Sequence, residues 1–180
     1  MITLPRVRAA FERVLETVVI LLMTSLAVVV LLAVVYRKAG ASFSWYDEVA
    51  SIQLAWLTYY GAALAALRRA HIGFDGLLRA MPPKLRVAAV LMAEAVVIGF
   101  FVVLAWTGVE VHYALEGDYL VSLPEVPVQL TKSVIPIGAV LFIAAQLMSL
   151  PEVLRAALTP RSPPGVPPPA GAASPEKPEG

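Results

Sequence analysis

The stretch "VLETVVILLMTSLAVVVLLAVV", residues 14–35, contains 22 residues, of which only Glu16 is charged. A helix needs about 20 predominantly apolar residues to cross a hydrocarbon core about 30 Å thick. Backbone N–H and C=O groups must be paired inside lipid, so a span of this length is expected to be helical. Three further apolar stretches of similar length follow in the chain. The sequence therefore predicts an all-α integral membrane protein with four transmembrane helices, at about 14–36, 48–67, 87–109 and 128–150.

The composition supports a membrane protein and excludes several other classes. Of the 180 residues, 59% are hydrophobic and 15% are charged, whereas soluble domains are about half apolar and about a quarter charged. The alternating polarity that β-barrel strands need is absent. A net charge of +1 gives no reason to expect nucleic acid as a partner. The chain has no cysteine, which excludes disulfides, thiol redox chemistry and cysteine-ligated metals.

The sequence contains no motif of an enzyme or of a cofactor site. It has no Walker loop, no nucleophile elbow and no cluster of metal-ligating residues. The two histidines, His71 and His112, are expected on opposite membrane faces, about 30 Å apart, where they cannot share a haem or a metal ion. We therefore expect neither enzymatic activity nor a bound cofactor.

The distribution of basic residues predicts the orientation in the membrane. Eleven of the fourteen lysines and arginines lie before residue 14, between residues 68 and 86, or after residue 154. Cytoplasmic loops carry an excess of such residues, so both termini are expected in the cytoplasm. The first apolar stretch is longer than a signal-peptide core and is read as a retained helix. The predicted organisation is a cytoplasmic flank, 1–13, a four-helix membrane domain, 14–155, and a disordered proline-rich tail, 156–180.

Aromatic and acidic residues stand together where the second helix should begin. Trp45 suits the headgroup region, and the negative charges of Asp47 and Glu48 complement the positive end of the helix dipole. A second interpretation, compatible with the first, pairs Asp47 or Glu48 with Arg37 across the short outer loop. Such a pair would hold the first helix against the second.

Glu94 is the one ionisable residue that the sequence places well inside a span. It should lie about 12 Å from the cytoplasmic end, level with Thr58, Tyr59 and Tyr60, whose hydroxyls could be its partners. Ionisable residues inside a membrane usually face protein or water. Glu94 is thus either a proton-coupling carboxylate or partner-subunit contact, or a buried acid that is hydrogen-bonded to a neighbouring helix.

Small residues and prolines predict where helices approach or bend. Proline lacks an N–H group, so Pro136 is expected to bend the fourth helix and Pro151 to end it. The loop at 67–86 is either a short helix lying on anionic lipid or an ordinary basic loop. Small residues four apart allow close helix packing, and they occur at Gly61–Ala65, Ala62–Ala66 and Ala95–Gly99.

The order of these features resembles the DctQ-like small membrane subunit of tripartite ATP-independent periplasmic (TRAP) transporters, over nearly all of residues 10–155. The segments that carry the resemblance are "YRKAG", "SWYDEVA", "AWLTYYGAALAALRRAHIGFD" and "VPVQLTKSVIPIGAVL". The positions that match the family pattern are Arg37, Trp45, Glu48, Trp56, Gly61, Arg69, His71, Ile72, Pro136 and Gly138.

The resemblance implies a four-span scaffold in the bacterial inner membrane. Its partners would be the lipid bilayer, a large TRAP membrane subunit and a periplasmic solute-binding protein that delivers an organic acid such as a dicarboxylate. Coupling to a sodium gradient would run through the large subunit, so no cofactor is implied here. The alternative is a stand-alone proton-coupled transporter that uses Glu94. Candidate structural or subunit-interface residues are Arg37, Trp45, Asp47, Glu48, Trp56, Tyr60, Gly61, Arg69, His71, Glu94 and Pro136.

Overall fold

Four long helices make up most of the chain. A computed structural model describes residues 4–41, 44–69 and 81–158. Four of its helical segments are long and apolar enough to cross a membrane, as the sequence predicts. The predictions for His71, for most of the loop at 67–86 and for the tail from 159 onward lie outside the described residues. The helices are α1 (Leu4–Lys38), α2 (Tyr46–Leu67), α4 (Pro83–Ala114), the short α5 (Val128–Lys132) and α6 (Val134–Leu158).

Three helices extend well beyond their predicted limits, whereas α2 begins only two residues early. α1 begins ten residues before residue 14, α4 reaches Ala114 and α6 continues to Leu158. The length of an apolar stretch indicates only the part of a helix that crosses lipid. The helix itself continues beyond that part where its polar residues form hydrogen bonds or ion pairs. The prediction that Pro151 ends the fourth helix is wrong, because Pro151 lies inside α6. The turn after it is held by an ion pair between Glu152 and Arg8 of α1.

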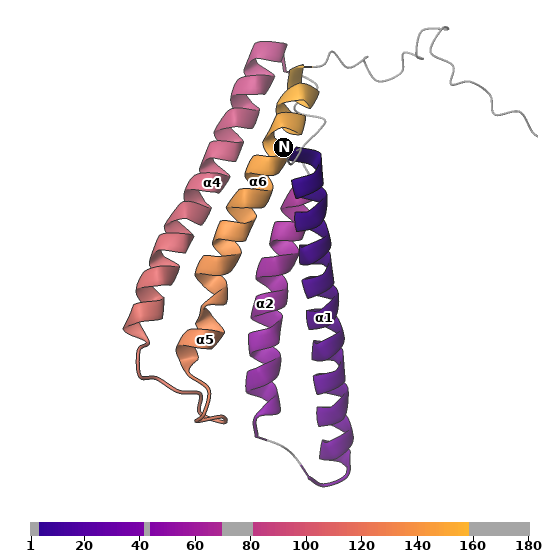
Figure 1. The fold of residues 1–180 in the computed structure, drawn as a ribbon, viewed down its shortest axis with the longest axis vertical. Coiled ribbons are helices and arrows are strands. Elements are labelled where there is room, and N and C mark those ends of the chain that lie inside the picture. The colour runs from indigo at the N-terminus through magenta and orange to yellow at the C-terminus, as the bar shows by residue number, and fades with distance from the viewer. Residues whose placement is uncertain (1–3, 42–43, 70–80, 159–180) are drawn as a thin grey trace, which may run out of the picture.

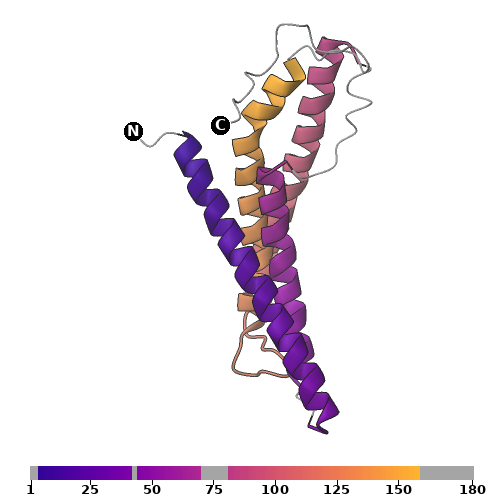
Figure 2. The same ribbon diagram turned by 90° about the vertical axis from the view of Figure 1, so that its right-hand side faces the viewer.

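The helices form one layer rather than a closed bundle. Across the layer the order is α4, α6, α2, α1 (Figure 1), and the main contacts join α4 to α6, α6 to α2, and α2 to α1. The view turned by 90° shows α1 crossing its neighbours obliquely (Figure 2). In α6, 39% of the most apolar window is buried, against 6% in α1 and in α4. The layer therefore leaves broad apolar faces of α1 and α4 uncovered within this chain.

The core lies where α1, α2 and α6 meet. Leu15, Leu67 and Ala145 are almost completely buried there. On the α4 side, the rings of Phe101 and Phe142 stack with their centroids 3.7 Å apart. Because lipid is as apolar as these side chains, close packing rather than the hydrophobic effect must hold the helices together.

Two glycines let neighbouring helices approach α6 closely. A Cβ atom added to Gly138 would lie 2.6 Å from Cβ of Tyr59 on α2. A Cβ atom added to Gly108 of α4 would lie 2.9 Å from Cγ2 of Ile135 and 3.0 Å from Cδ of Pro136. These distances are shorter than van der Waals contact, so only glycine fits at either position without a shift of the helices.

Gly61 and Gly99, which belong to the small-residue pairs that the sequence predicts to pack closely, do not serve this purpose inside the chain. Nothing lies within 4 Å of a Cβ atom built on Gly61 or on Gly99. α2 and α4, which carry these small residues, make no main contact with each other, because α6 lies between them. Ala66 is buried, but in the core shared with α1 and α6. An interface between Gly61 and another chain stays a prediction.

Candidate functional site

One buried carboxylate joins three helices near the end of the layer at which α1 begins. Glu94 of α4 is 8% exposed. Its Oε1 accepts a hydrogen bond from Nη1 of Arg69, at the end of α2, at 3.0 Å, and the two groups form an ion pair. Its Oε2 accepts from Nε2 of Gln146 on α6. The expected hydroxyl partners are therefore wrong: the carboxylate is bound by a cation and an amide.

Arg69 holds this position with a backbone conformation that is unusual for its residue type. Its φ is 54°, in the left-handed region that helix ends usually reserve for glycine. Its N–H donates to the carbonyl of Ala66 at 3.2 Å. A left-handed residue with a Cβ atom costs about 1–2 kcal/mol. The ion pair with Glu94 explains why an arginine occupies the position, since glycine would leave a buried carboxylate without its cation.

A second set of charges joins α1 to the same end of α2. Arg68 donates from Nε to Oε1 of Glu12 at 2.7 Å and pairs through Nη2 with Oε2 of Glu16 at 3.0 Å. The hydrogen bond to Glu12, and after it the smaller effect of the one to Glu16, raises the pKa of Arg68 above its usual value. The guanidinium therefore stays charged. Arg8 pairs with Glu152 and donates from Nη2 to the carbonyl of Leu67 at 3.0 Å.

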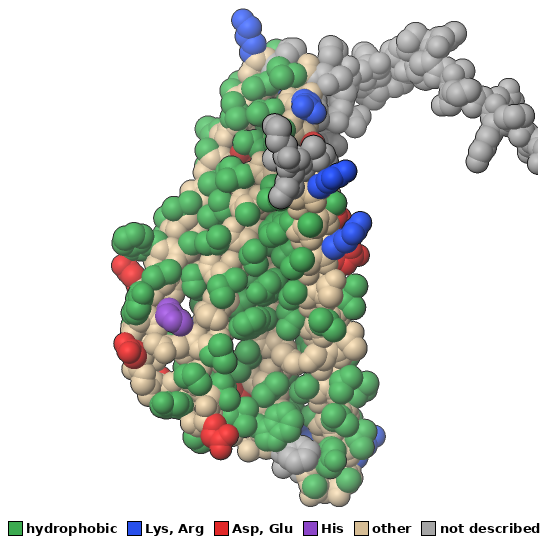
Figure 3. All heavy atoms as spheres, viewed as in Figure 1, with side chains coloured by type: hydrophobic (Ala, Val, Ile, Leu, Met, Phe, Trp, Pro, Cys, Tyr) green, Lys and Arg blue, Asp and Glu red, His purple; other side chains and the backbone are tan. Residues whose placement is uncertain are grey.

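These contacts form what we call the charged network, because they link all four spans at one end of the layer. Figure 3 shows lysine and arginine side chains gathered toward this end, and several acidic side chains toward the other. The network contains three cations and four anions, so its charges largely compensate one another. Its members are Arg8, Glu12, Glu16, Arg68, Arg69, Glu94, Gln146 and Glu152.

At the opposite end, Glu48 binds backbone rather than a cation. Its two carboxylate oxygens accept from the N–H of Val121 at 3.3 Å and of Ser122 at 2.9 Å. Neither Glu48 nor Asp47 forms a salt bridge with Arg37, although all three belong to the described residues. The predicted pair across the outer loop is thus wrong. Asp47 and Glu48 do lie in the first turn of α2, as predicted.

The break in the fourth span meets a tryptophan of α2. Ser133 separates α5 from α6. Pro136 lies in the first turn of α6 and has no N–H for the carbonyl of Lys132, four residues earlier. Nε1 of Trp56 donates to the neighbouring carbonyl of Thr131 at 3.1 Å. The break at Ser133 thus lies three residues before Pro136, beside a carbonyl that a side chain of α2 binds. The bend at Pro136 itself stays a prediction.

Replacing Trp56 with phenylalanine should lower the free energy of unfolding by about 1 kcal/mol, because the Thr131 carbonyl loses its side-chain donor. The ring remains available to stack on Tyr60, whose centroid lies 6.1 Å away. Thermal unfolding of the detergent-purified protein measures the change. Trp106→Phe is the matched control, since Trp106 is 70% exposed and bonds only to Glu110 on its own helix. Equal losses for both variants would contradict the assignment.

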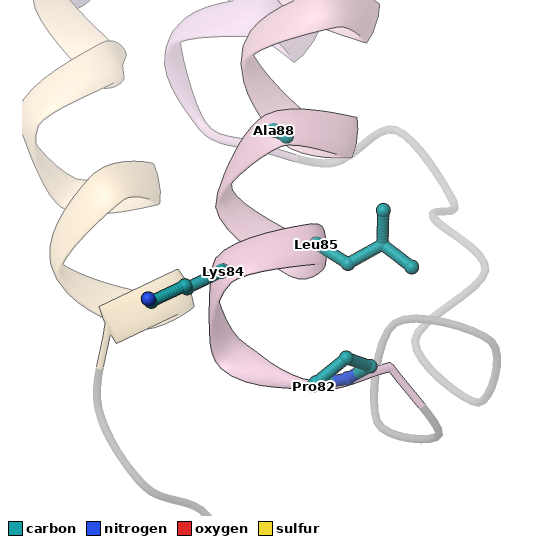
Figure 4. Close-up of a pocket in the computed structure, with 4 residues that line it drawn as sticks. All are labelled: Pro82, Lys84, Leu85 and Ala88. Atoms are coloured by element: carbon teal, nitrogen blue, oxygen red, sulfur yellow. The ribbon is translucent and has the colours of Figure 1, made fainter.

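His112 and a hollow on α4 lie outside the charged network. His112 lies inside α4 rather than past its end, and its backbone carbonyl accepts from Gln129 at 3.2 Å. Within residues 4–41, 44–69 and 81–158, no group of three or more His, Cys, Asp or Glu side chains could hold a metal ion. A hollow at the start of α4 is lined by Pro82, Lys84, Leu85 and Ala88 (Figure 4), and Lys84 is the charged residue among these described lining residues.

Sequence reasoning missed several partners of the residues that it identified. In the sequence, Gln146 has the character of an ordinary polar residue, and Arg8 that of a charge flanking the first span. Gln146 is nevertheless a further polar residue inside an apolar span, which is a signal that could have paired it with Glu94. The contacts of Glu48 with Val121 and Ser122 had no signal, because they join backbone groups more than 70 residues away.

A family model matches most of the chain. The model of the family described as "Tripartite ATP-independent periplasmic transporters, DctQ component" matches residues 26–156. No curated protein matches the chain. The matched region contains α2, α4, α5 and almost all of α6.

Proposed function

This chain belongs to the DctQ family, the small membrane components of tripartite ATP-independent periplasmic transporters, and we propose that it acts there as a scaffold for the large transport subunit. One observation supports this role above the others. The helices form a single layer, in which α1 and α4 leave most of their apolar surface uncovered. Such a layer can turn one face to lipid and the other to a second membrane protein.

The contacts within the layer favour a rigid element over a moving one. The charged network joins α1, α2, α4 and α6 at one end, and Glu48 ties α2 to the segment between α4 and α5 at the other. Gly108 and Gly138 place α6 tightly between its neighbours. A scaffold needs this kind of fixation, because the transport domain can move only against something that stays in place.

The remaining parts of the proposal concern location, cargo and coupling. The protein would lie in the bacterial inner membrane with both chain ends and the charged network on the cytoplasmic side, as the distribution of basic residues favours. A periplasmic solute-binding protein would deliver an organic acid, such as a dicarboxylate, to the large subunit. The sodium gradient would act through that subunit and not through this chain.

A stand-alone proton-coupled transporter finds less support. It would need Glu94 free to exchange a proton with a pathway through the layer. Glu94 is instead paired with Arg69 and with Gln146, and both contacts hold helices together. No other acidic residue of the charged network lies deep within a span, so the described residues offer no relay.

Co-purification and uptake test the proposed scaffold together. The affinity-tagged chain, co-expressed with a large TRAP membrane subunit from the same organism, is expected to retain that subunit through detergent extraction and gel filtration. Deleting the small subunit should abolish uptake across a panel of radiolabelled mono- and dicarboxylic acids, and re-expression should restore it. The proposal is wrong if uptake of every acid is unchanged in the deletion strain while immunoblots show the large subunit still in the membrane.

A further inference from the structure

The segment between α4 and α5 is a short, firmly held hairpin. We define the outer hairpin as residues 117–127. Tyr119 and Pro127 form an isolated antiparallel bridge. Around it, the N–H of Leu120 donates to the carbonyl of Val126 at 3.0 Å, and the N–H of Val128 donates to that of Asp118 at 2.9 Å. The hairpin thus has its own hydrogen-bond framework.

The outer hairpin is also fixed to α2. Besides the two backbone N–H groups that bind Glu48, the hydroxyl of Ser122 donates to the carbonyl of Ser44 at 3.2 Å. Leu120 points inward and is 8% exposed. The hairpin therefore has little freedom to fold its tip back onto the protein.

The outer hairpin exposes two apolar side chains, Tyr119 and Val121, which we call its tip. Val121, next to the buried Leu120, is 92% exposed, more than any other exposed large hydrophobic residue of the described chain. Tyr119, on the other side of Leu120, is 58% exposed. The alternation follows from the extended backbone, which sends successive side chains to opposite faces. The hydrogen bonds of the hairpin thus keep the apolar side chains of Tyr119 and Val121 exposed to solvent, although burying them would be favourable.

Acidic residues surround this tip. Glu116, Asp118 and Glu125 are all exposed, and none forms a salt bridge with another described residue. Three carboxylates beside the tip oppose its insertion into hydrocarbon, because charged groups in lipid are costly. A tip with an apolar centre and a charged rim instead matches the anatomy of a protein interface.

We propose that the outer hairpin is a docking surface for a water-soluble protein that presents basic side chains around an apolar depression. Val121 and Tyr119 fill the depression, and Glu116, Asp118 and Glu125 face the basic rim. A surface held in its bound shape loses little conformational entropy on association. This assignment rests on the proposed function. The partner is then the solute-binding subunit, and the small subunit binds it directly when it docks on the membrane complex.

The test measures binding of the purified solute-binding protein to the complex of small and large subunits in nanodiscs. Val121→Asp is expected to weaken binding by about tenfold or more, as for central interface residues, and to reduce uptake at limiting binding protein. Val7→Asp is the matched control, because Val7 is an exposed valine on α1 at the opposite end. Co-purification of the large subunit should be unchanged in both variants.

Each outcome decides the proposal. Unchanged binding to the Val121→Asp complex overturns it, whereas the scaffold role stands if the large subunit still co-purifies. Loss of the large subunit from the Val121→Asp preparation also overturns it, because the hairpin would then belong to the membrane interface. If Val121→Asp accumulates poorly, the double charge reversal at Glu116 and Glu125 to lysine replaces it. That variant must weaken binding and reduce its sensitivity to salt, or the proposal fails.

Discussion

Arg69→Ala is expected to lower the free energy of unfolding by about 3 kcal/mol, the low end of the range for removing one partner of a buried ion pair. The low end applies because the side chain of Arg69 is 35% exposed, whereas that of Glu94 is 10% exposed. Without Arg69, Glu94 retains the amide of Gln146 as its one partner among the described residues. Thermal unfolding of the detergent-purified protein, followed by tryptophan fluorescence, measures the loss.

A double-mutant cycle separates the ion pair from other effects of the substitution. Glu94→Gln removes the buried charge, so adding it to Arg69→Ala should recover part of the stability. The double variant is therefore expected to lose less free energy of unfolding than the sum of the losses in the two single variants. If the losses are simply additive, the two residues are not coupled and the assigned ion pair is wrong.

Arg69→Gly tests the backbone conformation at the same position. Glycine adopts a φ of 54° without the steric penalty that alanine bears. We therefore expect Arg69→Gly to be more stable than Arg69→Ala by about 1 kcal/mol, although both lack the guanidinium. Equal stabilities would show that the left-handed conformation is not maintained in the variants.

Gly138→Ala should destabilise the layer by about 1–3 kcal/mol, the usual range for overpacking a close contact. The new methyl group would lie 2.6 Å from Cβ of Tyr59. A Cβ atom cannot rotate away, so α2 and α6 must separate. The melting temperature in detergent is expected to fall, and crosslinks between α2 and α6 should form less efficiently.

Gly61→Ala is the matched control, because nothing lies within 4 Å of its added Cβ atom in this chain. Alanine favours a helix over glycine by about 1 kcal/mol, so the isolated small subunit should be equally stable or slightly more stable. A large loss from Gly61→Ala in the isolated subunit would contradict the helix arrangement. A loss seen only in the complex with the large subunit would support the predicted interface at Gly61.

The helices were predictable to different degrees at their centres and at their ends. The apolar part of each span was recognised because lipid thickness sets its length. The ends of α1 and α6 were not, since Arg8 and Glu152 stabilise each other only in the folded chain. Pro151 shows the same limit: a local rule against proline in a helix was overridden by tertiary contacts.

The candidate site was predictable as a set of residue types but not as a set of contacts. Glu94 stood out because an acid inside a span needs a partner, and the prediction of a buried, hydrogen-bonded carboxylate was right in kind. Its partners were chosen wrongly among the hydroxyls at the same depth. The sequence could not show that α6 lies between α2 and α4, and that placement brings Gln146 to Glu94.

The sequence by itself determined the number of spans, their approximate limits and the absence of cysteine chemistry, because lipid imposes a length and a polarity on every segment that crosses it. Only the tertiary structure decided which helices touch, which glycines matter and which partner each charge takes. The physical reason is that a lipid-facing side chain and a helix-facing one can be equally apolar. Packing inside a membrane is therefore selected by shape and by a few polar contacts, which hydropathy does not record.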